Sequence, residues 1–425
     1  MSLDNFAKNK LTEIFGRQTR KIMAKYHPKV VAVAGSVGKT TTKLAIATVL
    51  NESFKVRYQV GNYNTPISIP FIFTGREMPS LRNPFSWASA WLAGWKVLHS
   101  GFPYEVVVVE FGTDAPGDIE HLKSLLTPDI TVLTAISEEH MEFFKTLDAV
   151  AKEEMTVAEF SDTLVINADD VNKKYIDKHL FKDKRAYSYG FSATDYKITA
   201  KPNNNSYQVK ISLNDRESIK TEVNILAEHN LKTLAAAAAV ADLLGAKPAA
   251  IVKGLLKIRP MSGRMQLLKG INNSTIIDDT YNSSPLAVEA ALKTLYQINT
   301  DQRIAVLGMM NELGAYSREA HQRVGEYCDP RSLDLLVTIG KDANEYLAET
   351  AKANGCKVIR CHDPFEAGKV VKMNLKDGAA ILVKGSQNGV FAEETVKMLL
   401  AKSSDEAKLV RQNSFWKAIK NTQFK

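Results

Sequence analysis

The residues Val30-Val-Ala-Val-Ala-Gly-Ser-Val-Gly-Lys-Thr-Thr-Thr-Lys43 determine how the first half of this chain folds. The apolar run at 30–34 predicts a buried parallel strand, and a helical pattern continues to Leu50. A glycine turn between such a strand and helix lets backbone N–H groups approach phosphates, and the helix N-terminus adds partial positive charge. The stretch therefore predicts a site for the triphosphate of ATP or GTP.

Each residue type in this turn has an expected role at a triphosphate. Lys39 is placed to reach the β- and γ-phosphates, and Thr40 to ligate Mg²⁺. Val33 stands where the commonest phosphate loop (P-loop) has its first glycine, so this loop is a tighter variant. A chance turn is the alternative, but the strand, the helix and the hydroxyl run are all present. We expect the nucleotide to contact Gly35, Ser36, Val37, Gly38, Lys39, Thr40 and Thr41.

The composition is that of a soluble globular protein with two or three domains. The 425 residues are 45% hydrophobic and 24% charged, and the net charge of +8 is spread along the chain. No basic patch interleaved with aromatic residues is evident, so we expect anionic small-molecule substrates and no nucleic acid. The three cysteines form no Cys-x-x-Cys pair, and no apolar leader is visible. We therefore expect a cytoplasmic protein, and we take it to be a monomer.

One apolar segment, Phe85 to Leu98, is too short to span a bilayer. Trp87, Trp91 and Trp95 fall four apart in it, on one face of an expected helix. This stripe has two interpretations: it packs on the domain, or it makes a peripheral membrane contact. The basic N-terminal helix expected over residues 1–28 is a second candidate for such a contact.

Strands and helices alternate along most of the chain. Apolar runs predict strands at 105–111, 129–135 and 163–167, in the βαβ rhythm of a doubly wound sheet. A hairpin is expected over 196–213, and an Ala-rich helix over 230–244. After Gly263 the alternation restarts, with strands expected at 274–279, 303–308, 335–340, 357–361 and 379–384.

This pattern predicts an α/β protein with a P-loop central domain, whose doubly wound sheet is mostly parallel, and a smaller Rossmann-like C-terminal domain. We place the boundaries at 1–28 for the basic helix, 29–259 for the ATP-binding domain and 260–425 for the C-terminal domain.

Polar residues at strand ends are the candidates for chemistry, because ligands gather at the carboxyl ends of parallel strands. Glu110 ends one strand and is either a Mg²⁺ ligand or a helix cap. His140 follows the next strand and is a candidate ligand of a second metal ion. The segment 277–285 places two acids, a tyrosine and an asparagine at a strand end, with an Asx-turn and a helix cap as the alternative.

Together these residues resemble the Mur ligase family of ATP-dependent enzymes, and most of all its members that add D-alanyl-D-alanine to UDP-N-acetylmuramoyl-tripeptide. The resemblance runs in family order across nearly the whole chain, through residues 34–43, 61–64, 110–119, 139–142, 229–230, 263–266, 277–285, 306–314 and 382–386. It implies that a carboxylate attacks the γ-phosphate of ATP, forms an acyl phosphate and is then joined to an amine in the synthesis of a peptidoglycan precursor.

The resemblance also implies roles for individual residues. Lys39 would offset charge on the transferring phosphoryl group, Thr40 and Glu110 would hold the first Mg²⁺, and His140 would ligate the second. Asn230 matches a position near adenine, Arg264 lies at a hinge, and Asp278 and Asn282 match positions that close on the nucleotide. The expected substrate-contacting residues are Asn62, Asn64 and Lys384.

Four departures from the family pattern bear on the substrates. Only 28 residues precede the first strand, where most members have a domain that binds the UDP-sugar, so the precursor is either UDP-linked or lipid-linked. The family's carbamylated lysine falls on Glu154, so either Glu154 supplies the carboxylate directly or a local shift brings in Lys152. The other two departures replace an acid by Met309 and an arginine by Gln387 in the amine-binding domain.

Two alternative functions remain at this stage. One is an amino-acid ligase with another acceptor, such as a folylpolyglutamate synthase, a class that shares the fold and also lacks the UDP-sugar domain. The other is an ATP-binding protein with low turnover that depends on a partner.

Overall fold

The computed structural model describes residues 3–59, 61, 63–80, 83–179, 184–203, 206–214, 216–225 and 227–424. Contacts divide the chain into two compact units. The N-terminal unit comprises Met1–Ser137, Thr146–Asn224 and Asn230–Ile258, and the C-terminal unit comprises Glu138–Lys145, Ile225–His229 and Arg259–Lys425. The boundaries expected at residues 28 and 259 stay a prediction. Among the described residues, no helix is long and apolar enough to cross a membrane.

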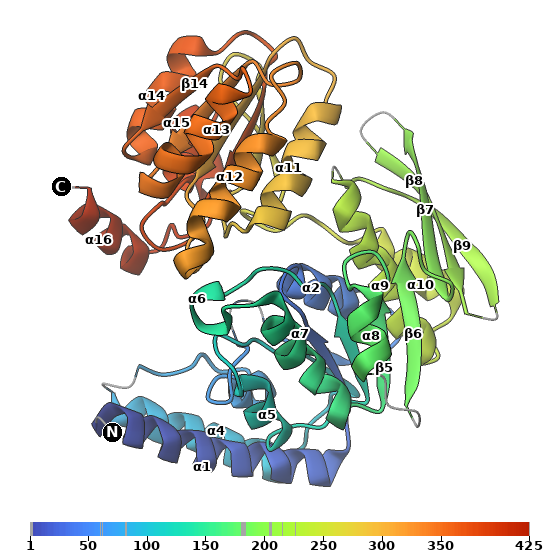
Figure 1. Cartoon of the computed structure of the whole chain (residues 1–425). Coiled ribbons are helices and arrows are strands. Elements are labelled where there is room, and N and C mark those ends of the chain that lie inside the picture. Colours follow the sequence, from blue (N-terminus) through green and yellow to red (C-terminus); the bar gives the residue numbers. More distant parts are fainter. Residues whose placement is uncertain are drawn as a thin grey trace. The chain divides into compact units, whose positions relative to one another are not determined.

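The N-terminal unit is built on one mixed sheet (Figure 1). Its strand order is β2-β3-β1-β4-β5-β6-β7-β8-β9, parallel from β2 to β7 and antiparallel from β7 to β9. The predicted hairpin is β7–β8, and β9 extends it as a third strand that the sequence did not predict. The strands are β1 (Lys29–Ala34), β2 (Val56–Arg57), β3 (Val106–Glu110), β4 (Ile130–Leu133), β5 (Thr163–Asn167), β6 (Arg185–Gly190), β7 (Tyr196–Asn203), β8 (Ser206–Leu213) and β9 (Arg216–Val223).

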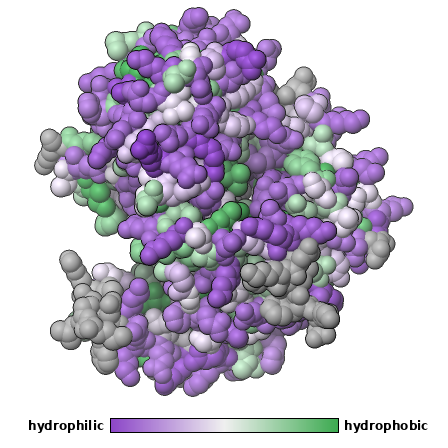
Figure 2. Space-filling view, in the orientation of Figure 1, coloured by the Kyte–Doolittle hydropathy of each residue, from purple (hydrophilic) through white to green (hydrophobic). Residues whose placement is uncertain are grey.

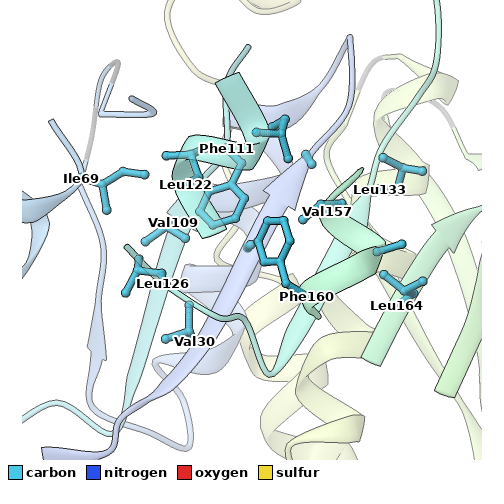
Figure 3. Packing of buried hydrophobic residues seen from close by; sticks show 14 of the residues in the cluster. Val30, Ile69, Val109, Phe111, Leu122, Leu126, Leu133, Val157, Phe160 and Leu164 are labelled. Carbon is cyan, nitrogen blue, oxygen red and sulfur yellow. The ribbon is translucent and has the colours of Figure 1, made fainter. Parts of the chain in front are cut away.

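Apolar strands hold this sheet together because their side chains are buried on both faces. Val30 of β1 and Val109 of β3 are fully buried, and the rings of Phe111 and Phe160 lie 6.3 Å apart in the same cluster (Figure 3). The helices of the unit are α1 (Leu3–Tyr26), α2 (Lys39–Leu50), α3 (Pro70–Thr74), α4 (Pro84–Ser100), α5 (Asp118–Lys123), α7 (Leu147–Met155), α8 (Lys173–His179), α9 (Glu228–Leu243) and α10 (Pro248–Leu255).

The C-terminal unit has a second sheet in the order β10-β11-β15-β12-β13-β14, parallel except for β10. The strands are β10 (Gln266–Lys269), β11 (Thr275–Asp279), β12 (Arg303–Gly308), β13 (Leu335–Ile339), β14 (Val358–Cys361) and β15 (Ala380–Lys384). The α-helices are α6 (Met141–Phe144), α11 (Pro285–Gln297), α12 (Ser317–Tyr327), α13 (Ala348–Ala353), α14 (Pro364–Asn374), α15 (Glu393–Leu399) and α16 (Ser414–Gln423).

The predicted fold class is confirmed: a phosphate-loop domain with a mostly parallel sheet is followed by a second α/β sheet domain. Hydrophilic residues cover most of the face in Figure 2, and hydrophobic ones appear there in small groups. In each sheet the carboxyl ends of the central parallel strands lie on the same side, and Glu110, Asp278 and Lys384 lie at such strand ends.

Candidate active site

The turn after β1 has the backbone that a phosphate loop needs. Gly35 and Gly38 have φ angles of 119° and 88°, which glycine adopts without strain. A Cβ atom on Gly35 would lie 2.4 Å from Thr134 Oγ1, so no larger residue fits. Gly38 is the N-cap of α2, and the partly exposed start of that helix presents backbone N–H groups to an anion.

The strand-ending acid of β3 lies against the first turn of α2. The Thr40 hydroxyl donates to Glu110 Oε2 at 3.0 Å, and Lys43 Nζ lies 3.1 Å from the same oxygen. All three side chains are buried. Glu110 thus lies next to the phosphate loop. Its contacts with Thr40 and Lys43 join side chains, whereas a helix cap would accept from backbone N–H groups.

Lys43 has a role that sequence reasoning missed. Its ammonium lies between the Glu110 carboxylate and the Gly61 carbonyl oxygen, which it contacts at 3.2 Å. Burial of a lysine is expensive unless the charge is paired, so this contact ties α2 to β3. The signal was present in the sequence, because Lys43 lies one helical turn after Lys39 and Thr40.

The two acids of helix α7 are buried, whereas its lysine is exposed. Glu154 is fully buried, and its Oε2 accepts a hydrogen bond from the Gly35 N–H at 2.7 Å. Glu153 instead accepts from the N–H groups of Gly117 and Ile119, at the start of α5. Lys152 is exposed. Of the two candidates for the family's carbamylated lysine, Glu154 is the one that contacts the phosphate loop.

His140 lies in the C-terminal unit, at the start of α6, with a φ of 50°. Its Nδ1 is 2.9 Å from Glu312 Oε2, and its Nε2 is 3.5 Å from Glu139 Oε1. Burial opposes a positive charge on the ring, but the hydrogen bonds with Glu139 and Glu312 outweigh it and raise the pKa of His140 to about 10. In this structure the ring is therefore held as a cation between two carboxylates.

Three further candidates have different surroundings. Asn64 lies against Gly112, where a Cβ atom would be 2.3 Å from its Nδ2, so it borders the end of β3. Asn230 is half-buried in the first turn of α9. Asn62 lies outside the described residues. Among those described, no group of three or more His, Cys, Asp or Glu side chains is arranged to hold a metal ion.

In the C-terminal unit, the ends of β11 and β15 form a buried polar cluster. Lys384 Nζ donates to Asp279 Oδ2 at 2.6 Å and to the Asn282 carbonyl oxygen at 2.9 Å. Burial lowers the pKa of Lys384, although the Asp279 carboxylate opposes the shift. Lys384 thereby fixes the backbone of the segment after β11 and does not point to solvent.

An arginine from outside this segment stacks on its Tyr281 ring. The Arg264 guanidinium lies 4.2 Å from the Tyr281 ring centroid, and its buried Nε has no hydrogen-bond partner in the described residues. Arg411, from the C-terminal tail, donates to the Tyr281 and Thr280 carbonyl oxygens at 3.0 and 2.5 Å and pairs with Glu393. Sequence reasoning missed Arg411, because no pattern in the C-terminal tail predicts that it donates hydrogen bonds to the distant turn at Thr280 and Tyr281.

Asp278 is fully buried beside this cluster. Its carboxylate accepts hydrogen bonds from the Gly263 and Thr280 N–H groups and from the Thr280 hydroxyl at 2.6 Å. Burial outweighs these bonds and raises the pKa of Asp278 to about 6. The folded protein therefore keeps a proton that the unfolded chain releases at a lower pH.

This shift predicts a measurable pH dependence of stability. Between pH 4 and 6 the unfolded chain binds fewer protons than the folded one at this site, so the contribution of Asp278 to the stability of the wild type falls as the pH rises. The rise in the pKa of Asp278 to about 6 corresponds to about 3 kcal/mol of stability. We expect Asp278→Asn to gain stability relative to the wild type across this window in urea unfolding. If the difference in unfolding free energy between Asp278→Asn and the wild type did not change with pH, the raised pKa of Asp278 would be contradicted.

Comparisons with known proteins match both units. Residues 98–241 match the Mur ligase middle domain, and residues 263–387 match the Mur ligase glutamate ligase domain. The chain belongs to the Mur ligase family. The family resemblance predicted from the sequence is confirmed.

Relatives and solved structures of this family cover most of the chain. The UDP-N-acetylmuramoyl-tripeptide–D-alanyl-D-alanine ligase of Bacillus subtilis is 29% identical over 88% of this chain and 76% of its own length, and that of Escherichia coli is 25% identical over 91% and 80%. MurF from Thermotoga maritima, solved in complex with ADP, has a TM-score of 0.75 at 23% identity over 93% of this chain and 84% of its own.

A Mycobacterium tuberculosis folylpolyglutamate synthase, solved with ADP and AMPPCP, has the same fold with a TM-score of 0.65 at 16% identity. It is matched over 94% of this chain and 99% of its own length. This likeness concerns the fold alone.

Proposed function

We propose that this Mur ligase is an ATP-dependent enzyme that joins D-alanyl-D-alanine to UDP-N-acetylmuramoyl-tripeptide in peptidoglycan synthesis. The substrates are those named for its Bacillus and Escherichia relatives, which it matches over most of their length. ATP is the nucleotide expected for the family, and we take the protein to act as a monomer.

The observation that carries the proposal is the contact between the phosphate loop and a strand-ending acid. The Thr40 hydroxyl and the Glu110 carboxylate meet at 3.0 Å, and Gly35 and Gly38 of the adjoining loop have positive φ angles. Both are hard oxygen ligands of the kind Mg²⁺ takes, together with phosphate oxygens and water. The residues thus fit this ion, which would neutralise charge on the transferring phosphoryl group.

In the proposed reaction, an oxygen of the substrate carboxylate attacks the γ-phosphorus of ATP, and ADP leaves. The amine then attacks the carbonyl carbon of the acyl phosphate, phosphate leaves, and the nitrogen loses a proton to give the amide. Lys39 and the N–H groups of the loop stabilise the charge of the phosphoryl group during the first step. The family resemblance implies that Arg264, Asp278 and Asn282 would contact the nucleotide, and that Asn64 and Lys384 would support substrate binding.

Phosphate release tests this proposal directly. ATP and Mg²⁺ are incubated with the muramoyl-tripeptide and D-alanyl-D-alanine, added singly and together, and the amide product is identified by mass spectrometry. We expect release and product only when both substrates are present. Turnover with a folate and glutamate pair instead would assign the chain to another acceptor. Binding of ATP without turnover on any pair would favour a partner-dependent protein.

We further propose that Glu154 supplies the carboxylate that the family takes from its carbamylated lysine. Its burial against Gly35 supports this role, and Lys152 is exposed. Glu154→Gln should then lower activity most strongly at limiting Mg²⁺, because a neutral amide binds the cation less well. Activity is measured against Mg²⁺ concentration, with Lys152→Ala as the matched control. If Lys152→Ala is instead the damaging change and bicarbonate modulates activity, a carbamate on Lys152 replaces this assignment.

His140 remains the proposed ligand of a second ion. In the present structure its ring pairs with Glu139 and Glu312, so ligation would require the ring to lose a proton and exchange these partners.

A further inference from the structure

Helices α1 and α4 form one layer at the edge of the N-terminal unit (Figure 1). Gln18 Nε2 donates to the Trp91 carbonyl oxygen at 2.9 Å, and Lys25 Nζ donates to that of Leu98 at 2.6 Å. The residue that is later in α1 contacts the residue that is later in α4, so the two helices run parallel. Inward from this layer, the Trp87 ring packs 5.5 Å from Phe15, in a small buried cluster.

The outward side of α4 carries large apolar residues that stay exposed in the described chain. Phe85 is 86% exposed, Leu92 56%, Trp95 48% and Trp91 44%. Leu92 follows Phe85 by seven residues, and Trp95 follows Leu92 by three. This spacing places the three side chains on one face of the helix. The tryptophan stripe predicted from the sequence is therefore divided: Trp87 packs on the domain, and the other two tryptophans face outward.

The outward side of α1 is basic. Residues 7–26 contain six basic side chains, all exposed, and a single acid, Glu13, which pairs with Arg17. Ile14, Gln18, Lys21 and Lys25 form a row with helical spacing, and Gln18 and Lys25 touch α4. Lys21 and the exposed Ile14 therefore border the aromatic side of α4. The segment 84–100 adds Lys96 and contains no acid.

We propose that α1 and α4 form a docking surface for a bilayer that contains anionic lipids. Tryptophan rings favour the headgroup region, where their polar N–H and their apolar face are both solvated, and phenylalanine and leucine side chains enter the acyl boundary beside them. Adjacent lysines and arginines attract anionic headgroups, and the surface carries almost no opposing charge. Because no described helix can cross a membrane, the layer lies on the bilayer and does not span it.

Vesicle binding tests the proposal with the full chain. Sedimentation with vesicles of phosphatidylcholine alone is compared with vesicles that contain about a third phosphatidylglycerol. We expect at least about tenfold tighter binding to the anionic vesicles, weakening as salt is added. Quenching of tryptophan fluorescence by brominated acyl chains reports whether the rings enter the interface.

The variant Trp91→Ser/Trp95→Ser should lower vesicle binding by about tenfold or more and abolish the quenching. Met373→Ser removes an apolar residue on α14 that is even more exposed, and it should change neither. Lys10→Glu/Lys21→Glu should remove the preference for anionic vesicles. Circular dichroism and ATP turnover without vesicles check that each variant is folded.

Two results would overturn the proposal. One is equal sedimentation of the wild type and the double tryptophan variant with anionic vesicles. The other is a wild type that ignores vesicles but forms a dimer that the tryptophan variant loses, which would make this layer a contact between two copies. Neither result bears on the ligase reaction, which is measured without lipid.

Discussion

Lys39→Ala should lower ATP-dependent phosphate release by about a thousandfold or more, because this lysine offsets charge on the transferring phosphoryl group. Lys39 is half-exposed at the start of α2, with its Nζ 3.4 Å from the Ser36 carbonyl oxygen. Because the side chain is only partly buried, we expect the fold of the variant to be intact. Turnover and urea unfolding are measured together on the same preparation.

Lys55→Ala is the matched control for this change, because Lys55 is an exposed lysine of the same unit outside the phosphate loop. It should keep full activity. If Lys39→Ala also retained full activity, the phosphate loop would not take part in the chemistry. If it unfolded the protein, Lys39 would be a structural residue.

Glu110→Gln is expected to damage both activity and stability. The amide can still accept the Thr40 hydrogen bond, but it leaves the buried Lys43 ammonium without its opposite charge. Loss of one partner of a buried ion pair typically costs about 3–5 kcal/mol. Activity should fall by about a hundredfold or more as well, because a carboxylate ligand of Mg²⁺ is lost.

A double variant separates these two effects. Glu110→Gln/Lys43→Met removes the unpaired charge and keeps a side chain of similar length. Stability should therefore return close to that of the wild type, because an apolar replacement of a buried pair is often neutral. Activity should stay low. Recovery of activity in the double variant would show that Glu110 serves only to neutralise Lys43.

The sequence predicted the larger part of the fold because its local patterns agree with the tertiary structure. The apolar strands and the glycine turn at 30–43 are local features, and so are the strand ends at Glu110 and Asp279. The third strand of the antiparallel extension, β9, was missed because its residues 216–223 are mostly polar and form no apolar run.

Parts of the site depend on contacts that no local pattern encodes. The pairing of His140 with Glu312 joins residues far apart in sequence, and so does the support of Tyr281 by Arg411. The choice between Glu154 and Lys152 was open in the sequence, because both lie on one short helix. Only the packing of α7 places Glu154 against Gly35 and turns Lys152 to solvent.

The transfer of a labelled oxygen tests the central claim most directly. The muramoyl-tripeptide is prepared with ¹⁸O in its reacting carboxylate and turned over with ATP, Mg²⁺ and D-alanyl-D-alanine. The released phosphate is then analysed by mass spectrometry. An acyl phosphate requires that each phosphate released with an amide carries one carboxylate oxygen. Amide formation with unlabelled phosphate would contradict attack of the carboxylate on ATP at this phosphate loop.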